Sequence, residues 1–196
     1  NDGEQIVLRD VLGGVIQDFT YDDAGRWPGR PDGTGSSLVA LNPSGDFNDP
    51  DNWYASREYG GSPGTEGIGL FADVVVNEVL AGPPLGGQDA IELYNTTAVP
   101  VSIAGWYLSD TSSMLTKYRI DPGDPRATIP PGGFVVFDET DFNAPGDPNA
   151  FALSSSGDDV WLMTADPGSG KLLRFADHVE FGSTPNGVSL GRWPDG

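Results

Sequence analysis

The sequence contains no cysteine and a single histidine, His178, among its 196 residues. No disulfide can therefore brace the fold, and no thiolate chemistry is available. A Ser-His-Asp triad would have to use His178. A zinc site needs several His, Cys or carboxylate ligands, and one His with no Cys makes such a site hard to assemble. We predict instead that His178 is a strand residue with its ring turned to solvent.

Basic residues are also scarce. The chain has 10 Lys and Arg against 29 Asp and Glu, which gives a formal net charge of −19. Acidic residues outnumber basic ones in both residues 1–66 and residues 67–196. Nucleic acids and anionic membrane surfaces are bound by clustered cations, so we expect neither as a partner. No apolar run approaches the roughly 20 residues of a membrane span, so we expect no membrane insertion.

Helical patterns are nearly absent, and the apolar runs are short and rich in β-branched and aromatic residues. The 28 glycines, 17 prolines and 10% aromatic residues fit a folded chain with many turns. Single helical turns are predicted at residues 49–53 and 147–151, where an Asp-Pro pair can begin a helix. We expect strands at residues 4–9, 15–21, 36–41, 73–80, 90–95, 106–109, 133–138, 158–164, 175–181 and 187–191, with a short edge strand at 99–103.

An internal repeat organises the chain. Residues 1–8 resemble residues 155–162, and each copy continues through a glycine-bearing turn into an aromatic strand that ends at Tyr21 or Phe181. Further on, Ser37-Leu38 matches Ser189-Leu190. The Gly-rich stretch at 60–67 has the composition of a linker. We predict that residues 1–66 are the C-terminal half of a first repeat with its exit linker, and that residues 67–196 are a second domain lacking its last segment.

Several motifs of residues 72–196 occur in the order and spacing of a known family. The chain resembles the bacterial lamin tail domain through Val-Val-Asn-Glu-Val at 75–79, Ile-Glu-Leu-Tyr-Asn at 91–95, Gly-Trp-Tyr-Leu-Ser-Asp at 105–110, Ile-Pro-Pro-Gly-Gly-Phe-Val-Val at 129–136, Leu-Ser-Ser-Ser-Gly-Asp at 153–158 and Ser-Leu-Gly-Arg-Trp-Pro-Asp-Gly at 189–196.

The resemblance implies an all-β fold: an immunoglobulin-like β-sandwich, present as one near-complete domain preceded by the C-terminal half of another. It also implies an accessory, non-enzymatic module of a larger secreted or surface protein. The first repeat departs from the family pattern because it lacks its front half. The second ends before a counterpart of residues 46–56.

Calcium is the sharpest chemical hypothesis, because one acidic loop is dense in oxygen ligands. Asp46, Asn48, Asp49 and Asp51 lie within six residues, and calcium takes six to eight oxygens from carboxylates, amides and carbonyls. The spacing is not that of an EF-hand. The competing interpretation is a solvated Asx turn that leads into the helical turn at 49–53. Residues 138–143 form a second, weaker candidate of the same kind.

Two tryptophans occur in identical Gly-Arg-Trp-Pro contexts, at Trp27 and Trp193. Such a ring at the end of a sandwich can stack on a sugar or a peptide, or it can close the end of the core. The core role is the one we expect for both. The binding role makes Trp27 and Trp193 the candidate binding surface.

Three smaller motifs have simpler interpretations. Gly168-Ser169-Gly170-Lys171 is similar to part of a phosphate-binding loop but lacks the flanking residues and the following helix, so we predict a hairpin turn. Asn95-Thr96-Thr97 fits the N-glycosylation triplet, and we predict a turn there too. Glu92 alternates with two apolar residues, so we predict that it is solvated.

These observations support three functional hypotheses. The first is a non-catalytic extracellular structural, adhesive or binding module of a larger bacterial secreted or surface protein. It needs no cofactor, and its partner would be a protein, a polysaccharide or a neighbouring domain, with self-association through the half-domain as a further option. The second is a calcium-stabilised ligand-binding domain. The third is a hydrolase that uses paired carboxylates, which 29 acidic residues neither identify nor exclude.

Overall fold

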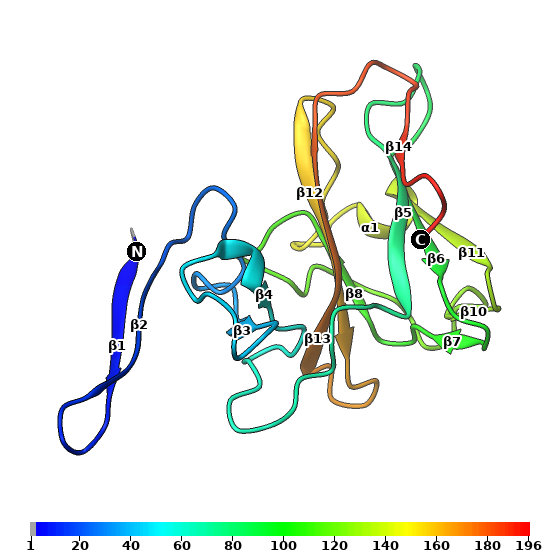
Figure 1. The fold of residues 1–196 in the computed structure, drawn as a ribbon. Helices are drawn as coiled ribbons and strands as arrows, with labels where there is room; N and C mark the ends of the chain where they lie inside the picture. Colours follow the sequence, from blue (N-terminus) through cyan, green and yellow to red (C-terminus); the bar gives the residue numbers. More distant parts are fainter. Residues whose placement is uncertain (1–2) are drawn as a thin grey trace. The chain divides into compact units, whose positions relative to one another are not determined.

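The computed structural model describes residues 3–196, which form two compact units (Figure 1). Unit 1 ends at Leu70, and unit 2 spans Phe71–Gly196. The sequence places this boundary a few residues earlier, between residues 66 and 67. None of the helices in the described residues has the length and apolarity needed to cross a membrane.

Unit 1 consists of two antiparallel strand pairs and one short helix. Its elements are β1 (Glu4–Arg9), β2 (Val15–Tyr21), β3 (Leu38–Ala40), a 3-10 helix (Pro50–Asn52) and β4 (Trp53–Ala55). Strands β1 and β2 form a hairpin, and β3 pairs with β4. The 3-10 helix is the helical turn predicted at 49–53, since the Asp49 carboxylate caps it by accepting a hydrogen bond from the Asp51 N–H.

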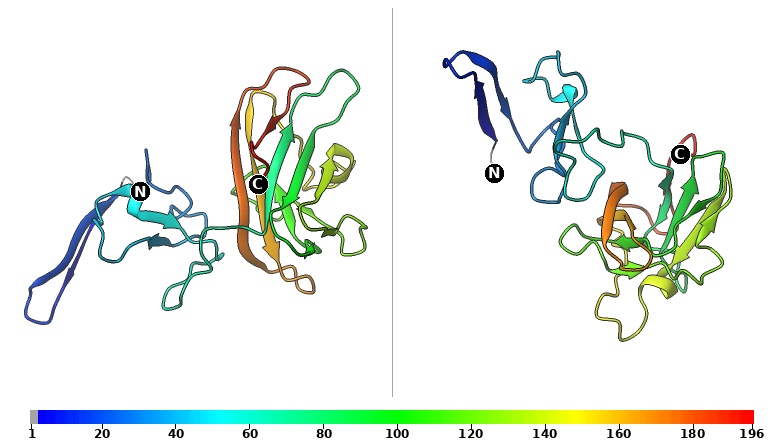
Figure 2. Two further views of the ribbon diagram at one scale, coloured as in Figure 1. Left: turned by 45° about the vertical axis from the view of Figure 1, so that its right-hand side comes forward. Right: turned by 90° about the horizontal axis from the view of Figure 1, so that it is seen from below.

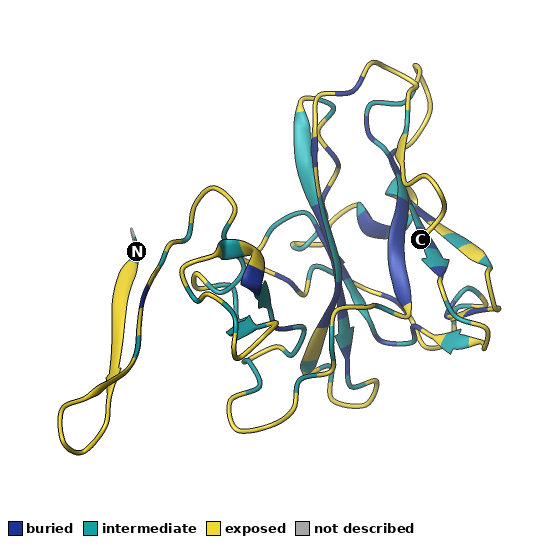
Figure 3. Cartoon of the chain, viewed as in Figure 1, coloured by how far each residue is buried: buried dark blue, intermediate teal, exposed yellow. Residues whose placement is uncertain are grey.

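The small core of unit 1 consists of aromatic rings. Phe19 packs against Phe47 and Trp53, with ring centroids 5.4 and 5.2 Å apart. Among the described residues of unit 1, Phe19 is the one apolar side chain that is buried. Figure 3 shows β1 exposed along its whole length. Unit 1 therefore has strands but little of the buried apolar surface that normally stabilises them.

Unit 2 is an immunoglobulin-like β-sandwich of two four-stranded sheets (Figure 2). One sheet has the order β13-β12-β8-β9, the other has the order β11-β6-β5-β14, and β7 and β10 pair separately. The elements are β5 (Val74–Leu80), β6 (Ala90–Asn95), β7 (Val101–Ser102), β8 (Tyr107–Ser109), β9 (Tyr118–Arg119), β10 (Thr128–Ile129), β11 (Phe134–Asp138), α1 (Glu139–Phe142), β12 (Gly157–Ala165), β13 (Leu172–Gly182) and β14 (Leu190–Gly191).

The core of unit 2 follows from strand alternation. In β6, Ile91, Leu93 and Asn95 are fully buried while the residues between them are half-buried. This period of two places every second side chain between the sheets. The largest members of the core include Phe137, Leu108 and Leu162, all with no exposed surface. The all-β sandwich expected from the sequence is confirmed.

The predicted strands at 4–9, 15–21 and 90–95 match the observed bounds, and the others differ by a few residues at their ends. The sequence missed β4, β9, β10 and α1. The helical turn predicted at 147–151 is wrong, because only a hydrogen-bonded turn forms there. The chain leaves that turn early: the Phe151 N–H donates to the Phe142 carbonyl, and the two rings stack at 4.6 Å.

The internal repeat has a counterpart in strand pairing. Hairpin β1–β2 pairs Glu4 with Tyr21, and hairpin β12–β13 pairs the matching residues, Asp158 and Phe181. The glycine before each hairpin has a positive φ, +85° at Gly3 and +120° at Gly157. A Cβ at these two positions would lie 2.6 and 3.0 Å from the backbone oxygen of Tyr21 and Phe181 respectively. The two hairpins therefore share one register and one local constraint.

Candidate functional site

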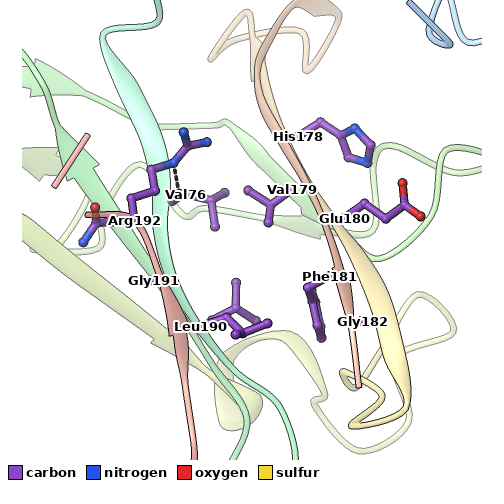
Figure 4. A pocket seen from close by; sticks show the side chains of 11 residues that line it. Val76, His178, Val179, Glu180, Phe181, Gly182, Leu190, Gly191 and Arg192 are labelled. Carbon is purple, nitrogen blue, oxygen red and sulfur yellow. Dashed lines mark hydrogen bonds between the residues drawn. The ribbon is translucent and has the colours of Figure 1, made fainter. Parts of the chain in front are cut away.

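A groove of about 500 Å³ opens along one side of the unit 2 sandwich. Figure 4 shows Val76, Val179, Phe181 and Leu190 projecting toward one another across it, from strands of both sheets. The groove exists because the sheets are poorly closed at this side: β13 is an edge strand, and its facing neighbour β14 has only two residues. An apolar groove beside strand edges suits a ligand that brings an apolar side chain on an extended backbone.

A polar tie joins the two sheets at one end of the groove. The Arg192 guanidinium donates to the Val76 carbonyl and to the Asp177 carboxylate, both at 2.9 Å. The same carboxylate oxygen of Asp177 accepts the Val76 N–H at 2.8 Å. Arg192 follows β14, and Asp177 lies in β13, so this tie fixes the width of the groove. The charged groups of Arg192 and Asp177 are therefore engaged with each other and with the backbone of β5.

Glu92 is not the solvated side chain predicted from alternation. It is half-buried, and its carboxylate accepts a hydrogen bond of 2.9 Å from the amide of Asn77, which is itself buried. The Asn77 amide also contacts the Asp195 carboxylate at 3.3 Å and accepts the Gly196 N–H at 3.2 Å. Glu92 therefore helps to anchor the segment that follows β14.

His178 lies in β13 as predicted, but its ring does not face solvent. The residue opposite it in the neighbouring strand is Trp161, and the two rings stack with centroids 3.6 Å apart and planes 13° apart. The His178 Nε2 lies 2.9 Å from a carboxylate oxygen of Asp159. The prediction failed because the cross-strand neighbour cannot be identified from local sequence. His178 and Glu180 belong to the lining of the groove, and Figure 4 shows their side chains pointing away from it.

The strongest charge cluster of unit 2 centres on Arg126. Its guanidinium donates to both oxygens of Asp141 and of Asp124, and to the Val136 carbonyl, and it lies 4.5 Å from the centroid of the Phe137 ring. Hydrogen bonds from Arg126 hold the pKa values of the Asp141 and Asp124 carboxyls below their usual range. These interactions join the segment before β10 to β11 and α1, which is the behaviour of a local structural tie.

The cluster around Arg126 also occupies a carboxylate of residues 138–143, the weaker calcium candidate. Asp138 caps α1 by accepting the Thr140 N–H, and Asp141 accepts the Asp138 N–H in a capping box. Both oxygens of Asp141 are already bound by Arg126. Nearby, burial, followed by the charge of Asp141, raises the pKa of the Tyr118 hydroxyl to about 12.

The first calcium candidate is a hydrogen-bonded loop in unit 1. Asp46 accepts the N–H of Asn48 at 2.8 Å, and Asp49 accepts the N–H of Asp51 at 3.1 Å. The Asn48 amide oxygen accepts the Thr20 N–H at 3.1 Å, and the Asp51 carboxylate pairs with Arg26.

Each of the four candidate side chains therefore already has a protein partner. Within residues 3–196, no three His, Cys, Asp or Glu side chains gather in a way that could hold a metal ion. Calcium binding by this loop stays a prediction, which thermal unfolding in calcium after EDTA treatment, with magnesium as control, would test.

The two Gly-Arg-Trp-Pro tryptophans have different surroundings. Trp27 is half-buried, with ring centroids 6.4 Å from Tyr21 and 6.2 Å from Trp53. Trp193 is 95% exposed and follows directly on Arg192 at the end of the groove. The core role expected for both rings therefore describes Trp27 and fails for Trp193, whose ring follows the end of β14 at Gly191 and is exposed.

We expect this difference to appear in stability. Trp27→Ala should lower the free energy of unfolding of unit 1 by about 2 kcal/mol, because the ring loses its aromatic contacts. Trp193→Ala, the matched control, should change unfolding by less than about 0.5 kcal/mol. Urea denaturation of each variant, followed by NMR signals from the two units separately, measures both values. Equal losses in the two variants would contradict the assignment.

The motifs similar to a phosphate-binding loop and to a glycosylation triplet both have structural roles. Residues 168–171 belong to the tight connection between β12 and β13, as predicted, where Ser169 donates to the Asp166 carboxylate and lowers its pKa. Asn95, the acceptor position of the glycosylation triplet, is fully buried at the end of β6. Its amide donates to the backbone carbonyls of Val99, Ile129 and Pro130. A glycan cannot be attached to this side chain in the folded domain.

The residues that define the groove were only partly visible in the sequence. The motifs at 75–79 and 189–196 contain Val76, Leu190 and Arg192, but nothing local indicates that they face one another. The repeat marks Leu190 as part of a strand equivalent to β3, because Ser37-Leu38 matches Ser189-Leu190, but the first copy has no counterpart of Val76. The pairing of Arg192 with Asp177 has no signal in a single sequence, since charge partners across strands leave no local pattern.

Comparison with known proteins agrees with this architecture. The family model described as Lamin Tail Domain matches residues 71–180, which is more than half of the chain and most of unit 2. No curated protein and no solved structure matches the chain. The family is one of immunoglobulin-like, non-enzymatic domains, in keeping with a site made of an apolar groove and structural charge pairs. The chain belongs to the lamin tail domain family.

Proposed function

We propose that this chain is a non-catalytic structural and binding module of a larger secreted or surface protein of bacterial type, and that its ligand is a polypeptide segment held in the unit 2 groove. The observation that carries the proposal is a second groove, in unit 1, at the equivalent position. That groove is already lined by an aromatic residue of an added strand, Trp53 of β4.

The equivalence rests on the repeat. Strand β2 matches β13, and β3 matches β14, so Phe19 corresponds to Val179 and Leu38 to Leu190. The unit 1 groove is about 360 Å³ and includes Phe19, Leu38 and Trp53 in its lining. The Trp53 ring stacks on Phe19 at 5.2 Å. In unit 1, the Trp53 side chain thus covers Phe19, whereas the corresponding residue of unit 2, Val179, lines an open groove.

Strand edges point to the same kind of ligand. In an antiparallel pair, neighbouring residues direct their N–H and C=O groups to opposite edges. In unit 1, the Ser37 carbonyl and the Leu41 N–H bond to β4 or its flanks, at 2.8 and 2.7 Å. The residues of unit 2 that match these are Ser189 and Trp193. Ser189 and Trp193 direct their backbone groups to the edge of β14 that faces away from β5, since the intervening residue Arg192 donates its backbone N–H to the Asn77 carbonyl of β5.

The far edge of β14 therefore has no strand partner among the described residues, because β14 ends its sheet. An extended peptide can pair with such an edge through main-chain hydrogen bonds while one side chain enters the groove. This favours a polypeptide over a polysaccharide as the ligand, because a sugar chain has no backbone to continue a ladder. Trp193, exposed beside the groove, supplies further contact surface.

A peptide with the sequence of residues 46–56 is the probe. We expect it to bind the full chain with a Kd of about 1 mM or tighter, because a short unstructured peptide must lose entropy on binding. NMR shifts should occur at Val179, Leu190 and Gly191. These residues lie in unit 2, so their signals report binding there and do not respond if the peptide displaces β4 in unit 1. The matched control peptide carries alanine at the position of Trp53.

The aromatic side chain should account for most of the binding. The control peptide should bind at least about tenfold more weakly, in line with burial of one indole ring. Trp193→Ala in the protein should also weaken binding, because the exposed ring supplies contact surface beside the groove, while the folded module tolerates the change. Equal binding of the two peptides, or shifts confined to unit 1, would overturn the assignment of the groove as a polypeptide site.

A further inference from the structure

We propose that unit 1 is the back half of a second lamin tail sandwich, and that its free strand edges bind the front half of that sandwich. The front half is a polypeptide segment with strands equivalent to β5 and β8, joined ahead of the hairpin β1–β2 in the order that unit 2 uses. This inference goes beyond the binding function proposed above, because it concerns unit 1 and does not involve the unit 2 groove.

The first observation is a difference in burial between matched residues. Val160 and Leu162 of β12 have no exposed surface, because they face the core between the two sheets. Their counterparts in β1 are Ile6 and Leu8, which are 43% and 54% exposed. The pairing registers justify the match, since Glu4 and Asp158 hold the same position opposite Tyr21 and Phe181. Unit 1 thus carries the apolar face of a sandwich without the opposing sheet.

The second observation concerns the edge of β1. In unit 2, β12 pairs with β13 on one edge and with β8 on the other, where Leu162 lies opposite Leu108. In unit 1, as far as residues 3–196 show, β1 pairs with β2 alone, in a two-stranded sheet. The edge of β1 near Leu8 is therefore the place where a strand equivalent to β8 would pair.

The third observation concerns the edge of β3. In unit 2, Leu190 of β14 pairs with Val79 of β5. The same edge of β14 carries the backbone N–H of Arg192, which donates to the Asn77 carbonyl of β5. The matching edge of β3 carries Leu38 and Ala40. Strand β4 occupies the opposite edge, because it is bonded through the intervening residues, as described above. A strand equivalent to β5 would therefore find its edge of β3 open.

These two free edges correspond to the two places where strands of the front and back halves of unit 2 pair with each other, β8 with β12 and β5 with β14. A single front segment would pair with both of them and would also cover Ile6 and Leu8. One ligand thus accounts for all three observations. Exposed apolar strands of this kind are otherwise sites of unwanted pairing, which natural proteins normally protect.

A second copy of the chain is a poor source of that segment. In unit 2, β5 already lies between β6 and β14, and β8 lies between β12 and β9. Both strands have neighbours on both edges, so they cannot pair with unit 1 of another molecule unless unit 2 opens. The segment must therefore be an additional front half, and the covalent order of unit 2 places it ahead of the hairpin.

The experiment extends the full chain with a duplicate of residues 71–154 joined ahead of residue 1, because residues 1–8 match residues 155–162. We expect hydrogen exchange at the amides of Val7–Arg9, Leu38 and Ala40 to slow by about 100-fold or more relative to the unextended chain. The extended protein should be monomeric by light scattering. Signals of Leu162 and His178, which the duplicate does not contain, report whether unit 2 itself remains folded.

Two variants of the extended chain separate completion of a sandwich from a non-specific effect. Leu8→Asp places a charge on the face that the duplicate should cover, and it should abolish the slowed exchange. Leu12→Asp is the matched control, because Leu12 is 92% exposed at the hairpin tip, and it should leave the exchange slow.

The proposal fails if the duplicate stays unfolded while unit 2 is intact, or if Leu8→Asp and Leu12→Asp behave alike. It also fails if the unextended chain already protects these amides. In that case a dimer would identify a second copy as the natural cover, and a monomer would identify unit 2 of the same chain.

Discussion

Replacing Asn95 with alanine should destabilise unit 2 by about 3 kcal/mol, which corresponds to a drop in Tm of about 10 °C. The side chain is fully buried, and its amide donates to three backbone carbonyls at 2.8–3.1 Å. Its oxygen accepts the N–H and the hydroxyl of Thr97. Alanine would leave these buried groups without partners, and an unsatisfied buried polar group costs more than the hydrogen bond that it loses.

Urea denaturation of the full chain, followed by signals from unit 2, measures the loss at Asn95. Asn95→Asp should be at least as damaging, because a carboxylate of similar shape would face the same three carbonyl oxygens without a donor. Asn186→Ala is the control at an exposed asparagine, and it should change stability by less than about 0.5 kcal/mol. A loss below about 1 kcal/mol for Asn95→Ala would mean that water replaces the amide.

Arg126→Gln should lower the free energy of unfolding of unit 2 by about 2 kcal/mol at neutral pH. The guanidinium holds two carboxylates and a carbonyl and lies over the Phe137 ring, and glutamine can replace at most part of this set. Arg126→Lys should have an intermediate effect, since an ammonium keeps the charge but cannot bind two carboxylates in a forked geometry.

The effect of Arg126→Gln should depend on pH. The pKa values of Asp141 and Asp124 are lowered in the folded state. The stability linked to them is therefore fully present above the ordinary carboxyl pKa of about 4 and disappears as pH falls through the lowered values. The gap between the wild type and Arg126→Gln should then shrink below about pH 4. Arg174→Gln, at an exposed arginine of β13, is the control. A gap that stays constant from pH 7 to pH 3 would contradict the assignment.

How far the sequence predicted the fold depended on how local the signal was. Residues 90–95 are a short run of mostly apolar and aromatic residues that ends at Asn95, so β6 was predicted to the residue. Strands β9 and β10 have two residues each, which is too short for any pattern, and neighbours distant in the chain determine them. Helix α1 was missed because it has only four residues, which a capping box stabilises. The carboxylates of that capping box were interpreted in the sequence as possible metal ligands.

The candidate site was less predictable than the fold. The alternation of Val179-Glu180-Phe181 puts Val179 and Phe181 on one face of a strand, but it does not show that β14 leaves them partly uncovered. Trp27 and Trp193 have identical sequence neighbours, yet one packs in a ring cluster and the other is exposed. Local sequence cannot separate them, because the difference lies in what the rest of the chain brings over each ring.

The placement of β14 beside β5 also has a mechanical consequence. The chain enters β5 at Val74 and leaves β14 after Gly191, which is paired with Glu78, so the entering and leaving segments point the same way along adjacent antiparallel strands. A pulling force between these segments would break the β5–β14 hydrogen bonds one after another, rather than loading them all at once. The Arg192 contacts with Val76 and Asp177 would be among the first to carry the load. A fibre built from such domains would extend at low force by peeling β14, while the rest of each sandwich stayed folded.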